Sequence, residues 1–308
     1  MRFFLIPILL LSVSTSFADV MRVTILGSGT PRPDINRFSQ SILVEAGGEK
    51  LLFDTGRGSA IRLSQANINI GDINEIFLTH LHSDHTLGMP DVIMTGWIYQ
   101  RKKTLNIYGP EGTKAFIKDI KSAFKEDIKI RVVPPENHSE EGLKTKTYEI
   151  QQGLIFEKNQ LKVIAFDVDH GGGVKHAYGY KITYKGRSVV ISGDTNYSAN
   201  LVSHAKNSDL LIHEIADAPL SVINKYPKVK GLMNYHTTPE EMARVINEAK
   251  PRYTVLTHML LLGGISETDV ITKVKKLTNN KAEVELAYDL MAIDVKDDIR
   301  TYSIDYDK

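Results

Sequence analysis

Four side chains that can bind a transition metal lie within six residues, in the segment Thr79-His80-Leu81-His82-Ser83-Asp84-His85. Three are histidines, in a chain that contains ten. The preceding residues, Glu75-Ile76-Phe77-Leu78, have the character of a short buried strand, so the segment lies where a strand ends and the chain turns. Side chains at such a turn can converge on one point. Imidazole and carboxylate suit zinc and its first-row neighbours, so the segment predicts a metal site.

Composition restricts how that site can be built. The chain has 308 residues, 42% of them hydrophobic, which is ample for one domain or two fused half-domains. It contains no cysteine, so disulfides, thiolate ligands and a cysteine nucleophile are excluded. A metal site in this chain must therefore use His, Asp or Glu.

Residues 1–18 have the pattern of a secretory signal peptide. Arg2 gives a basic start, residues 3–11 are almost wholly apolar, and Ser16-Phe17-Ala18 resembles an A-x-A cleavage site. We expect cleavage after Ala18, one folded domain over residues 19–308, and a periplasmic or secreted protein. The apolar run is too short to span a bilayer comfortably, so no transmembrane segment is expected after cleavage.

The mature charge argues against a nucleic-acid partner. Cleavage removes Arg2 and no acidic residue, so the 38 Lys and Arg become 37, equal to the 37 Asp and Glu. A nucleic-acid binder would carry a general basic field, which the mature chain lacks, so we expect no nucleic-acid partner. The local cluster Arg101-Lys102-Lys103 is interpreted as the solvated end of a helix. Oligomeric state stays open between a monomer and a homodimer.

Apolar strands alternate with helices along the chain, which predicts stacked α and β layers. Gly47-Gly48 predicts a hairpin between two strands, and Thr238-Pro239-Glu240-Glu241 predicts a capped helix start. The expected strands are 22–26, 41–44, 50–53, 75–78, 162–166, 177–184, 188–191, 210–212 and 254–256. The expected helices are 59–65, 111–124, 199–205, 240–249 and 267–277.

Several of these strands end on residues that can bind metal or move protons. These residues are His80, Asp169-His170, Asp194, His213-Glu214 and His258. Five such strand ends beside one histidine-rich segment are unlikely to be independent. They predict a single cleft at one edge of the sheets.

With these motifs the chain resembles the metallo-β-lactamase superfamily. The matching pieces are the His80–His85 segment, Asp54 before Gly56, His170, Ser192-Gly193-Asp194-Thr195 and Thr257-His258. The resemblance implies an α/β fold, the four-layer αβ/βα sandwich, with two Zn²⁺ between its sheets; the same ligands also suit Mn²⁺ or Fe²⁺. It implies His80, His82 and His170 as ligands of one ion. Asp84, His85 and His258 would hold the second, and Asp194 would bridge both.

Two assignments near this site have an alternative: the third histidine ligand and the role of Asp54. His176 competes with His170, which is preferred because it follows a strand and is flanked by glycine. Asp54 is interpreted as orienting a ligand histidine, or else as stabilising a turn. Two ions about 3.5–4 Å apart can share a hydroxide, lower its pKa and clamp an anionic substrate.

Three further motifs resemble the branch that contains ribonuclease Z, arylsulfatase-type enzymes and cyclic-nucleotide phosphodiesterases. They are Leu26-Gly27-Ser28-Gly29-Thr30-Pro31, His213-Glu214 and His236-Thr237-Thr238. In ribonuclease Z the matching glutamate and histidine donate a proton to the leaving group, so Glu214 and His236 join Asp84 as candidate catalytic residues. Alternatively, His236 is a residue at the start of a helix and has no catalytic role.

One departure separates the chain from ribonuclease Z. The bacterial enzyme carries a long tRNA-gripping arm where this chain has only the tight turn Tyr184-Lys185-Gly186-Arg187. The leading hypothesis is therefore an exported di-zinc hydrolase that cleaves a small phosphodiester or aryl sulfate ester by attack of a metal-bound hydroxide. The alternatives are a ribonuclease Z-like 3′-tRNA-processing endonuclease and a non-catalytic metal-binding protein.

Overall fold

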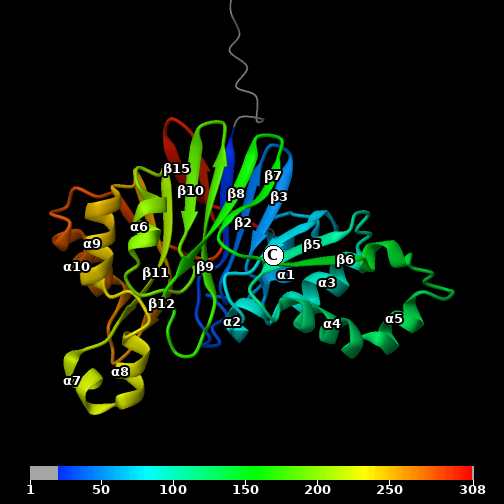
Figure 1. Cartoon of the computed structure of the whole chain (residues 1–308), viewed down its shortest axis with the longest axis horizontal. Coiled ribbons are helices and arrows are strands. Elements are labelled where there is room, and N and C mark those ends of the chain that lie inside the picture. The colour runs from blue at the N-terminus through cyan, green and yellow to red at the C-terminus, as the bar shows by residue number, and fades with distance from the viewer. Residues whose placement is uncertain (1–19, 307–308) are drawn as a thin grey trace, which may run out of the picture.

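A computed structural model describes residues 20–306 of the chain, in which two β-sheets pack face to face and helices cover their outer faces (Figure 1). The expected signal peptide, residues 1–18, lies outside the described residues. None of the helices within residues 20–306 is long and apolar enough to cross a membrane.

The first sheet has eight strands in the order β15-β14-β1-β2-β3-β4-β5-β6. Pairing is antiparallel from β15 to β3 and parallel from β3 to β6. The expected hairpin at Gly47-Gly48 is confirmed, since β2 and β3 pair antiparallel and both glycines have positive φ, 59° and 80°. The strands are β1 (Met21–Gly27), β2 (Ser41–Ala46), β3 (Glu49–Phe53), β4 (Glu75–Phe77), β5 (Leu105–Gly109), β6 (Thr145–Glu149), β14 (Met291–Val295) and β15 (Ile299–Ser303).

The second sheet has seven strands in the order β13-β12-β11-β10-β9-β8-β7. Pairing is antiparallel from β7 to β10 and parallel from β10 to β13. Tyr184 pairs with Arg187, so only Lys185 and Gly186 connect β9 to β10, as expected for a tight turn. The strands are β7 (Gly153–Lys158), β8 (Leu161–Val168), β9 (Ala177–Tyr184), β10 (Arg187–Ile191), β11 (Leu210–Asp217), β12 (Tyr253–Leu261) and β13 (Val284–Leu286).

The helices complete two outer layers. In Figure 1, α1, α3, α4 and α5 lie on the side of the first sheet, and α6, α9 and α10 lie on the side of the second. The short helices α7 and α8 project beside β11 and β12. The helices are α1 (Ser59–Gln65), η2 (Ile70–Asp72), α2 (Ser83–Thr86), α3 (Met89–Ile98), α4 (Thr113–Ala123), α5 (Lys125–Arg131), η3 (Glu140–Leu143), α6 (Ala199–Ala205), α7 (Leu220–Lys225), α8 (Pro227–Met233), α9 (Pro239–Ala249) and α10 (Glu267–Leu277).

Three apolar clusters hold these layers together. One fills the space between the sheets and includes Phe77 and Tyr180. A second joins the first sheet to α1, α3 and α4 through residues such as Trp97. The third joins the second sheet to α6, α9 and α10 and includes Met242 and Val274. A helix–sheet–sheet–helix order with a core at each interface is the four-layer sandwich, so the expected fold class is confirmed.

The start of α9 also follows the sequence prediction. The Thr238 hydroxyl accepts from the Glu241 amide at 3.3 Å, and the Glu241 carboxylate accepts from the Thr238 amide at 2.9 Å. This capping box supplies partners for amides at the helix start. It also fixes the chain two residues after His236.

Strands β11 and β12 are longer than the sequence analysis predicts. The expected strands ended at 212 and 256, but the structure extends them to Asp217 and Leu261. Their register shifts beyond Glu214, where Thr257 is paired with Glu214, and Met259 with Ile215. His258 is the unpaired residue of this bulge and has φ 45°. It therefore lies within a strand, and the bulge redirects its side chain.

The interpretation of Arg101 as part of a solvated helix end is wrong. Arg101 is only 3% exposed, while Lys102 and Lys103 are exposed. Burial lowers the pKa of Arg101 to about 10. A guanidinium offers five donors, enough to satisfy carbonyls where α3, η2 and η3 meet irregularly. Its nitrogens donate to the backbone carbonyls of Ile73, Val92, Ile93 and Gly142.

Candidate metal centre

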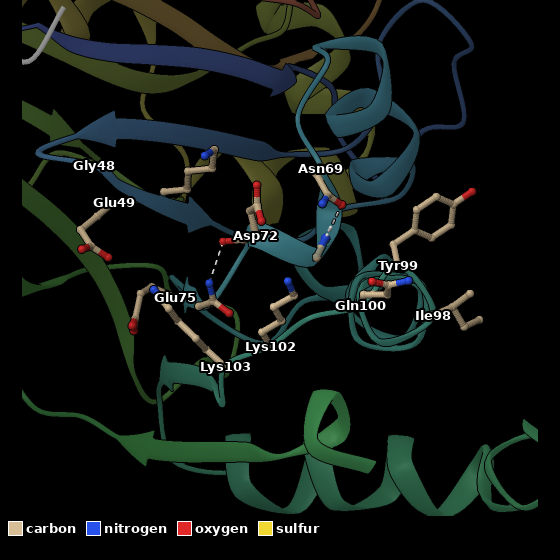
Figure 2. Close-up of a pocket in the computed structure, with 13 residues that line it drawn as sticks. Gly48, Glu49, Asn69, Asp72, Glu75, Ile98, Tyr99, Gln100, Lys102 and Lys103 are labelled. Atoms are coloured by element: carbon tan, nitrogen blue, oxygen red, sulfur yellow. Dashed lines mark hydrogen bonds between the residues drawn. The ribbon is translucent and has the colours of Figure 1, made fainter. Parts of the chain in front are cut away.

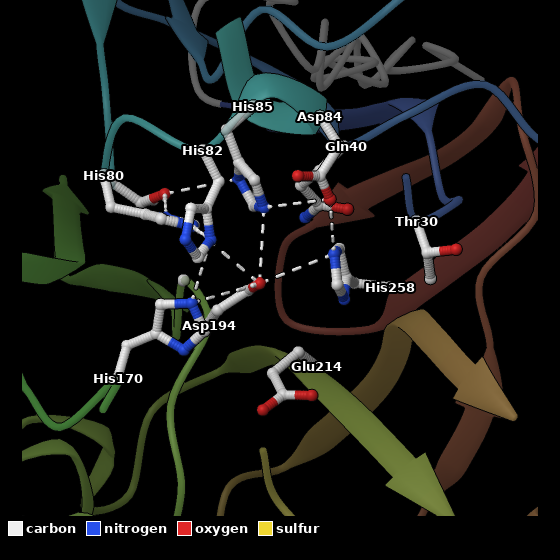
Figure 3. A network of polar contacts seen from close by, with 12 residues as sticks. Thr30, Gln40, His80, His82, Asp84, His85, His170, Asp194, Glu214 and His258 are labelled. Atoms are coloured by element: carbon white, nitrogen blue, oxygen red, sulfur yellow. Dashed lines mark hydrogen bonds and ion pairs between the residues drawn. The ribbon is translucent and has the colours of Figure 1, made fainter. Parts of the chain in front are cut away.

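The seven ligands that the resemblance implies come together at one edge of the two sheets (Figure 3). Possible ligand atoms of His80, His82 and His170 lie within 4.8 Å of one another. Those of Asp84, His85 and His258 form a second group within the same limit. His82 is exposed while the other members of both groups are buried, so the cluster meets solvent on the His82 side.

Asp194 lies between the two groups. Its Oδ2 is 3.4 Å from Nε2 of His85 and 3.5 Å from Nε2 of His258. The same oxygen is 4.0 Å from Nε2 of His80 and 4.0 Å from Nε2 of His170. One buried carboxylate oxygen thus faces histidines of both groups, which is the position that a bridging ligand requires.

Asp54 fixes the orientation of His85. Its Oδ2 is 2.7 Å from Nδ1 of His85, and its two oxygens accept the amide and hydroxyl protons of Thr79, each at 2.8 Å. A carboxylate at Nδ1 leaves Nε2 of the imidazole free to bind metal. Asp54 was expected here from the sequence, but Thr79 was not; its hydroxyl is also 3.0 Å from Nδ1 of His80.

The bulge at His258 completes the second group. The backbone amide of His258 donates to the carbonyl of Ser28 at 3.0 Å, which ties the bulge to the end of β1. Its Nε2 lies 3.0 Å from Oδ2 of Asp84. A histidine with φ 45° is an uncommon backbone conformation, and here it turns a strand residue toward the centre.

Several ring nitrogens face each other. Nδ1 of His82 is 2.9 Å from Nε2 of His80 and 3.2 Å from Nε2 of His170. Burial lowers the pKa of all three histidines, which favours neutral rings with lone pairs. Three neutral rings converging in this way suit a cation between them better than mutual hydrogen bonding.

The second group shows the same fit. Burial is the largest influence and acts to lower the pKa of His85 and of His258. The neighbouring carboxylates together outweigh it and raise both pKa values: Asp194 and Asp54 beside His85, and Asp194 and Asp84 beside His258. Nε2 of His85, which lies 3.4 Å from Asp194 and 3.6 Å from Asp84, is nevertheless buried without a hydrogen-bond partner. An unsatisfied nitrogen between two carboxylates is chemically suited to a divalent cation, so these residues fit the metal ions that the fold implies.

Glu214 and His236 lie beside the cluster. Nδ1 of His236 is 3.3 Å from Oε1 of Glu214, an ion-pair distance without hydrogen-bond geometry. That oxygen also accepts from the amides of Thr195 at 3.3 Å and Thr237 at 2.9 Å. Burial is the largest influence and acts to lower the pKa of His236, but the carboxylates of Glu214 and Asp194 together outweigh it and raise the pKa to about 9. A ligand atom of His236 also lies within 4.8 Å of ligand atoms of His170 and Asp194.

Three further residues clarify the arrangement. His176 lies outside the cluster, half exposed, with Nε2 3.8 Å from Glu111. His213 is buried, but it belongs to none of the ligand groups among the described residues. Tyr235 was not singled out from the sequence; its carbonyl oxygen is 3.2 Å from Nδ1 of His170, and its ring packs against that imidazole.

Cavity volume alone does not identify the site. A cavity of about 620 Å³ lies near η2 and the end of α3, and no histidine lines it (Figure 2). Lys102 and Lys103 share it with Asp72 and Glu75. By contrast, His82 lines a cavity of about 710 Å³ that also contains residues of the 172–176 loop. The histidine cluster therefore has its own open space on the His82 side.

Comparison with known proteins agrees with the fold and the cluster. Residues 49–259 match a family model described as "Beta-lactamase superfamily domain". The chain belongs to the metallo-β-lactamase superfamily, in the part of it that contains ribonuclease Z and phosphodiesterases. It is a member of a family of metal-dependent hydrolases that act on ester bonds.

Individual relatives cover most of the chain. "Ribonuclease Z" of Mycobacterium sp. (strain KMS) is 30% identical over 286 residues, which are 90% of this chain and 96% of that protein. Human tRNase Z, short form, has a TM-score of 0.64 and 25% identity, covering 90% of this chain and 100% of that one. The metallo-β-lactamase fold protein YhfI from Bacillus subtilis has a TM-score of 0.70 and 20% identity, with 90% and 100% covered.

Proposed function

We propose that this protein is an exported di-zinc phosphodiesterase that cleaves a small phosphodiester. The observation that carries the proposal is the place of Asp194 Oδ2, which faces His85 and His258 on one side and His80 and His170 on the other. Two ligand groups that share one carboxylate suit two ions. A paired site of this kind is used in hydrolysis of phosphate esters.

The metal ions would supply positive charge that activates water and stabilises the charge that develops on the phosphoryl oxygens. Asp194 offsets part of that positive charge. Asp54 holds His85 in the orientation that presents Nε2 to the centre. Burial of His80 and His85 excludes bulk water from one side of the site, which strengthens every electrostatic interaction there.

His236 is the group that would give a proton to the leaving oxygen. At 4% exposure it is buried, and the carboxylate of Glu214 favours its protonated form. Glu214 is itself held by the amides of Thr195 and Thr237. The pair therefore keeps a proton beside the metal cluster, where an alkoxide leaving group needs one.

The comparisons favour a phosphodiester over an aryl sulfate. The relatives at about 30% identity are named ribonuclease Z, a name that denotes cleavage of phosphodiester bonds in RNA. The phosphoryl and sulfuryl groups share a tetrahedral shape, so the ligand cluster by itself does not separate them. The names of the relatives therefore support a phosphodiester as the first candidate substrate.

A 3′-tRNA-processing endonuclease is the second candidate, and the 90% coverage by ribonuclease Z favours it. Two features argue against it. Only Lys185 and Gly186 connect β9 to β10 in this chain. Bacterial ribonuclease Z carries its tRNA-gripping arm at the corresponding place. Residues 19–308 also have no net formal charge.

A substrate panel tests the proposal. The mature protein, loaded with Zn²⁺ or Mn²⁺, would be assayed on bis(p-nitrophenyl) phosphate, cyclic nucleotides, aryl sulfates and a precursor tRNA. We expect metal-dependent turnover of the phosphodiesters. Specific cleavage of the precursor tRNA would favour the second candidate, and bound metal without turnover of any substrate would indicate a non-catalytic metal-binding protein.

A further inference from the structure

A second cavity adjoins the centre on the side of His258. It has a volume of about 370 Å³ and is lined by residues 28–37 of the loop after β1 and residues 259–267 around the end of β12. Ser28 lines it, and the Ser28 carbonyl accepts from the amide of His258. Figure 3 shows Thr30, another lining residue, beyond His258 on the side away from His82. None of the seven ligand residues lines the cavity, but it lies next to the second ligand group through Ser28 and Met259, the bonded neighbours of His258.

One wall of the cavity, formed by the end of β12 and the turn after it, is apolar. Met259, Leu260, Leu261 and Leu262 follow His258 directly, line the cavity and are each half-buried. Ile265 joins them after the turn at residues 263–264. Five adjacent apolar residues that remain partly accessible beside a polar centre form a surface that gains free energy when an apolar group covers it.

The charges at the rim balance. Arg37 is engaged, because its guanidinium donates to Glu267 at 2.8 Å, to the Ser28 hydroxyl at 2.8 Å and to the Ala287 carbonyl at 2.7 Å. Arg32 and Asp34 also line the cavity and carry opposite charges. The balance gives no net attraction for a second phosphate, so a neutral group suits the cavity better than an anionic one.

The two cavities lie on opposite sides of the ligand cluster. The one of about 710 Å³ begins at His82, and the one of about 370 Å³ begins beside His258. A phosphodiester has two substituents, one on each side of the phosphorus. A substrate centred on the cluster would therefore place one substituent in each cavity.

We propose that the cavity lined by Met259–Leu262 and Ile265 is a subsite for a neutral alkyl or aryl substituent of the diester. This inference rests on the proposed function, and it specifies the class of substrate. The favoured substrate carries at least one apolar group of several carbons attached to the phosphoryl centre. A diester with only small polar substituents would leave the apolar wall uncovered.

A homologous series of p-nitrophenyl alkyl phosphates, from methyl to hexyl, tests the inference on the metal-loaded protein. Nitrophenolate is the leaving group throughout, so only the chain length changes. Each methylene buried against the wall is expected to raise kcat/KM about fourfold, until the cavity is filled. If the esters are turned over but kcat/KM does not change with chain length, the subsite is contradicted and the proposed phosphodiesterase function stands. If no ester of the series is turned over, the proposed function itself is contradicted.

Two variants test whether the alkyl chain of the substrate binds in this cavity. Leu261→Ser should reduce the increase per methylene, and Ile265→Trp should make the increase stop at a shorter chain because the cavity is smaller. Leu277→Ser is the matched control, since Leu277 is an exposed leucine at the end of α10. Metal content and thermal unfolding verify that each variant folds. An unchanged dependence on chain length in both folded variants would mean that the alkyl chain binds elsewhere, which contradicts the inference.

Discussion

The carboxylate of Asp54 lies 2.7 Å from Nδ1 of His85 and also accepts two hydrogen bonds from Thr79, the residue that precedes the ligand segment. One side chain at the end of β3 thus connects the first hairpin to the histidine cluster. Asp54 has φ 56°, a conformation that Asp and Asn adopt more readily than most residues. This contact makes Asp54 part of the support for metal binding.

Asp54→Asn should weaken metal binding by roughly 10–100-fold, the range observed when a partner of a ligand histidine is removed. Asparagine keeps the size and tolerates the backbone conformation but loses the negative charge. Competition with a chromogenic chelator measures the affinity. Asp72→Asn, at an exposed carboxylate of the remote cavity, is the control. Equal affinity in Asp54→Asn and the wild type would leave Asp54 with a turn-stabilising role only.

Asp194→Ala should lower the metal content from two ions per monomer and abolish most activity, because its Oδ2 faces both ligand groups. Elemental analysis of dialysed protein provides the measurement. Asp119→Ala, on the exposed face of α4, should retain both ions. Unchanged metal content in Asp194→Ala would exclude Asp194 from the bridging position.

His236→Ala should keep its metal and lose roughly 10²–10⁴ in turnover, the range that general acid catalysis supplies. The loss should be large for an ester with an alkoxide leaving group and small for a nitrophenyl ester, since nitrophenolate is already a stable anion. Steady-state rates on both esters test this difference. Equal losses would assign His236 to substrate positioning or to the fold, and metal loss would assign it to the coordination shell.

Glu214→Gln should shift the alkaline limb of the pH–rate profile to lower pH. Burial acts to lower the pKa of His236, but Glu214, together with Asp194, raises it to about 9, so removal of the Glu214 charge lets His236 lose its proton at a lower pH. A general acid acts only while protonated, and the rate on an alkoxide-leaving ester therefore falls earlier. Both proteins would be compared with the same bound metal, because cations lower this pKa. Glu240→Gln, at the exposed start of α9, should not shift the limb; an unshifted limb in Glu214→Gln as well would contradict the pairing.

The mature protein should begin near Asp19. Export through a signal peptide would remove residues 1–18, and N-terminal sequencing of protein from the native host gives the result directly. An intact Met1 on a cytoplasmic protein would contradict export. It would also strengthen the tRNA-processing alternative.

Local signals in the sequence determined much of the fold. Gly47-Gly48 specifies a hairpin because glycine accepts positive φ, and Thr238 with Glu241 specifies a helix start because their side chains satisfy the first amides. The spacing of His80, His82, Asp84 and His85 placed four potential ligands on one turn. In each case the physical cause lies within a few residues of chain, so the sequence alone carries the information.

Only the tertiary structure decided how distant residues meet. His258 turns toward Asp84 because a bulge between β11 and β12 and the carbonyl of Ser28 hold it at positive φ. Arg101 is buried because three irregular segments present their carbonyls to it, although its two lysine neighbours suggested a solvated site. Strand register, bulges and buried polar contacts depend on contacts between segments that are distant along the chain, and no local period or turn residue encodes those contacts.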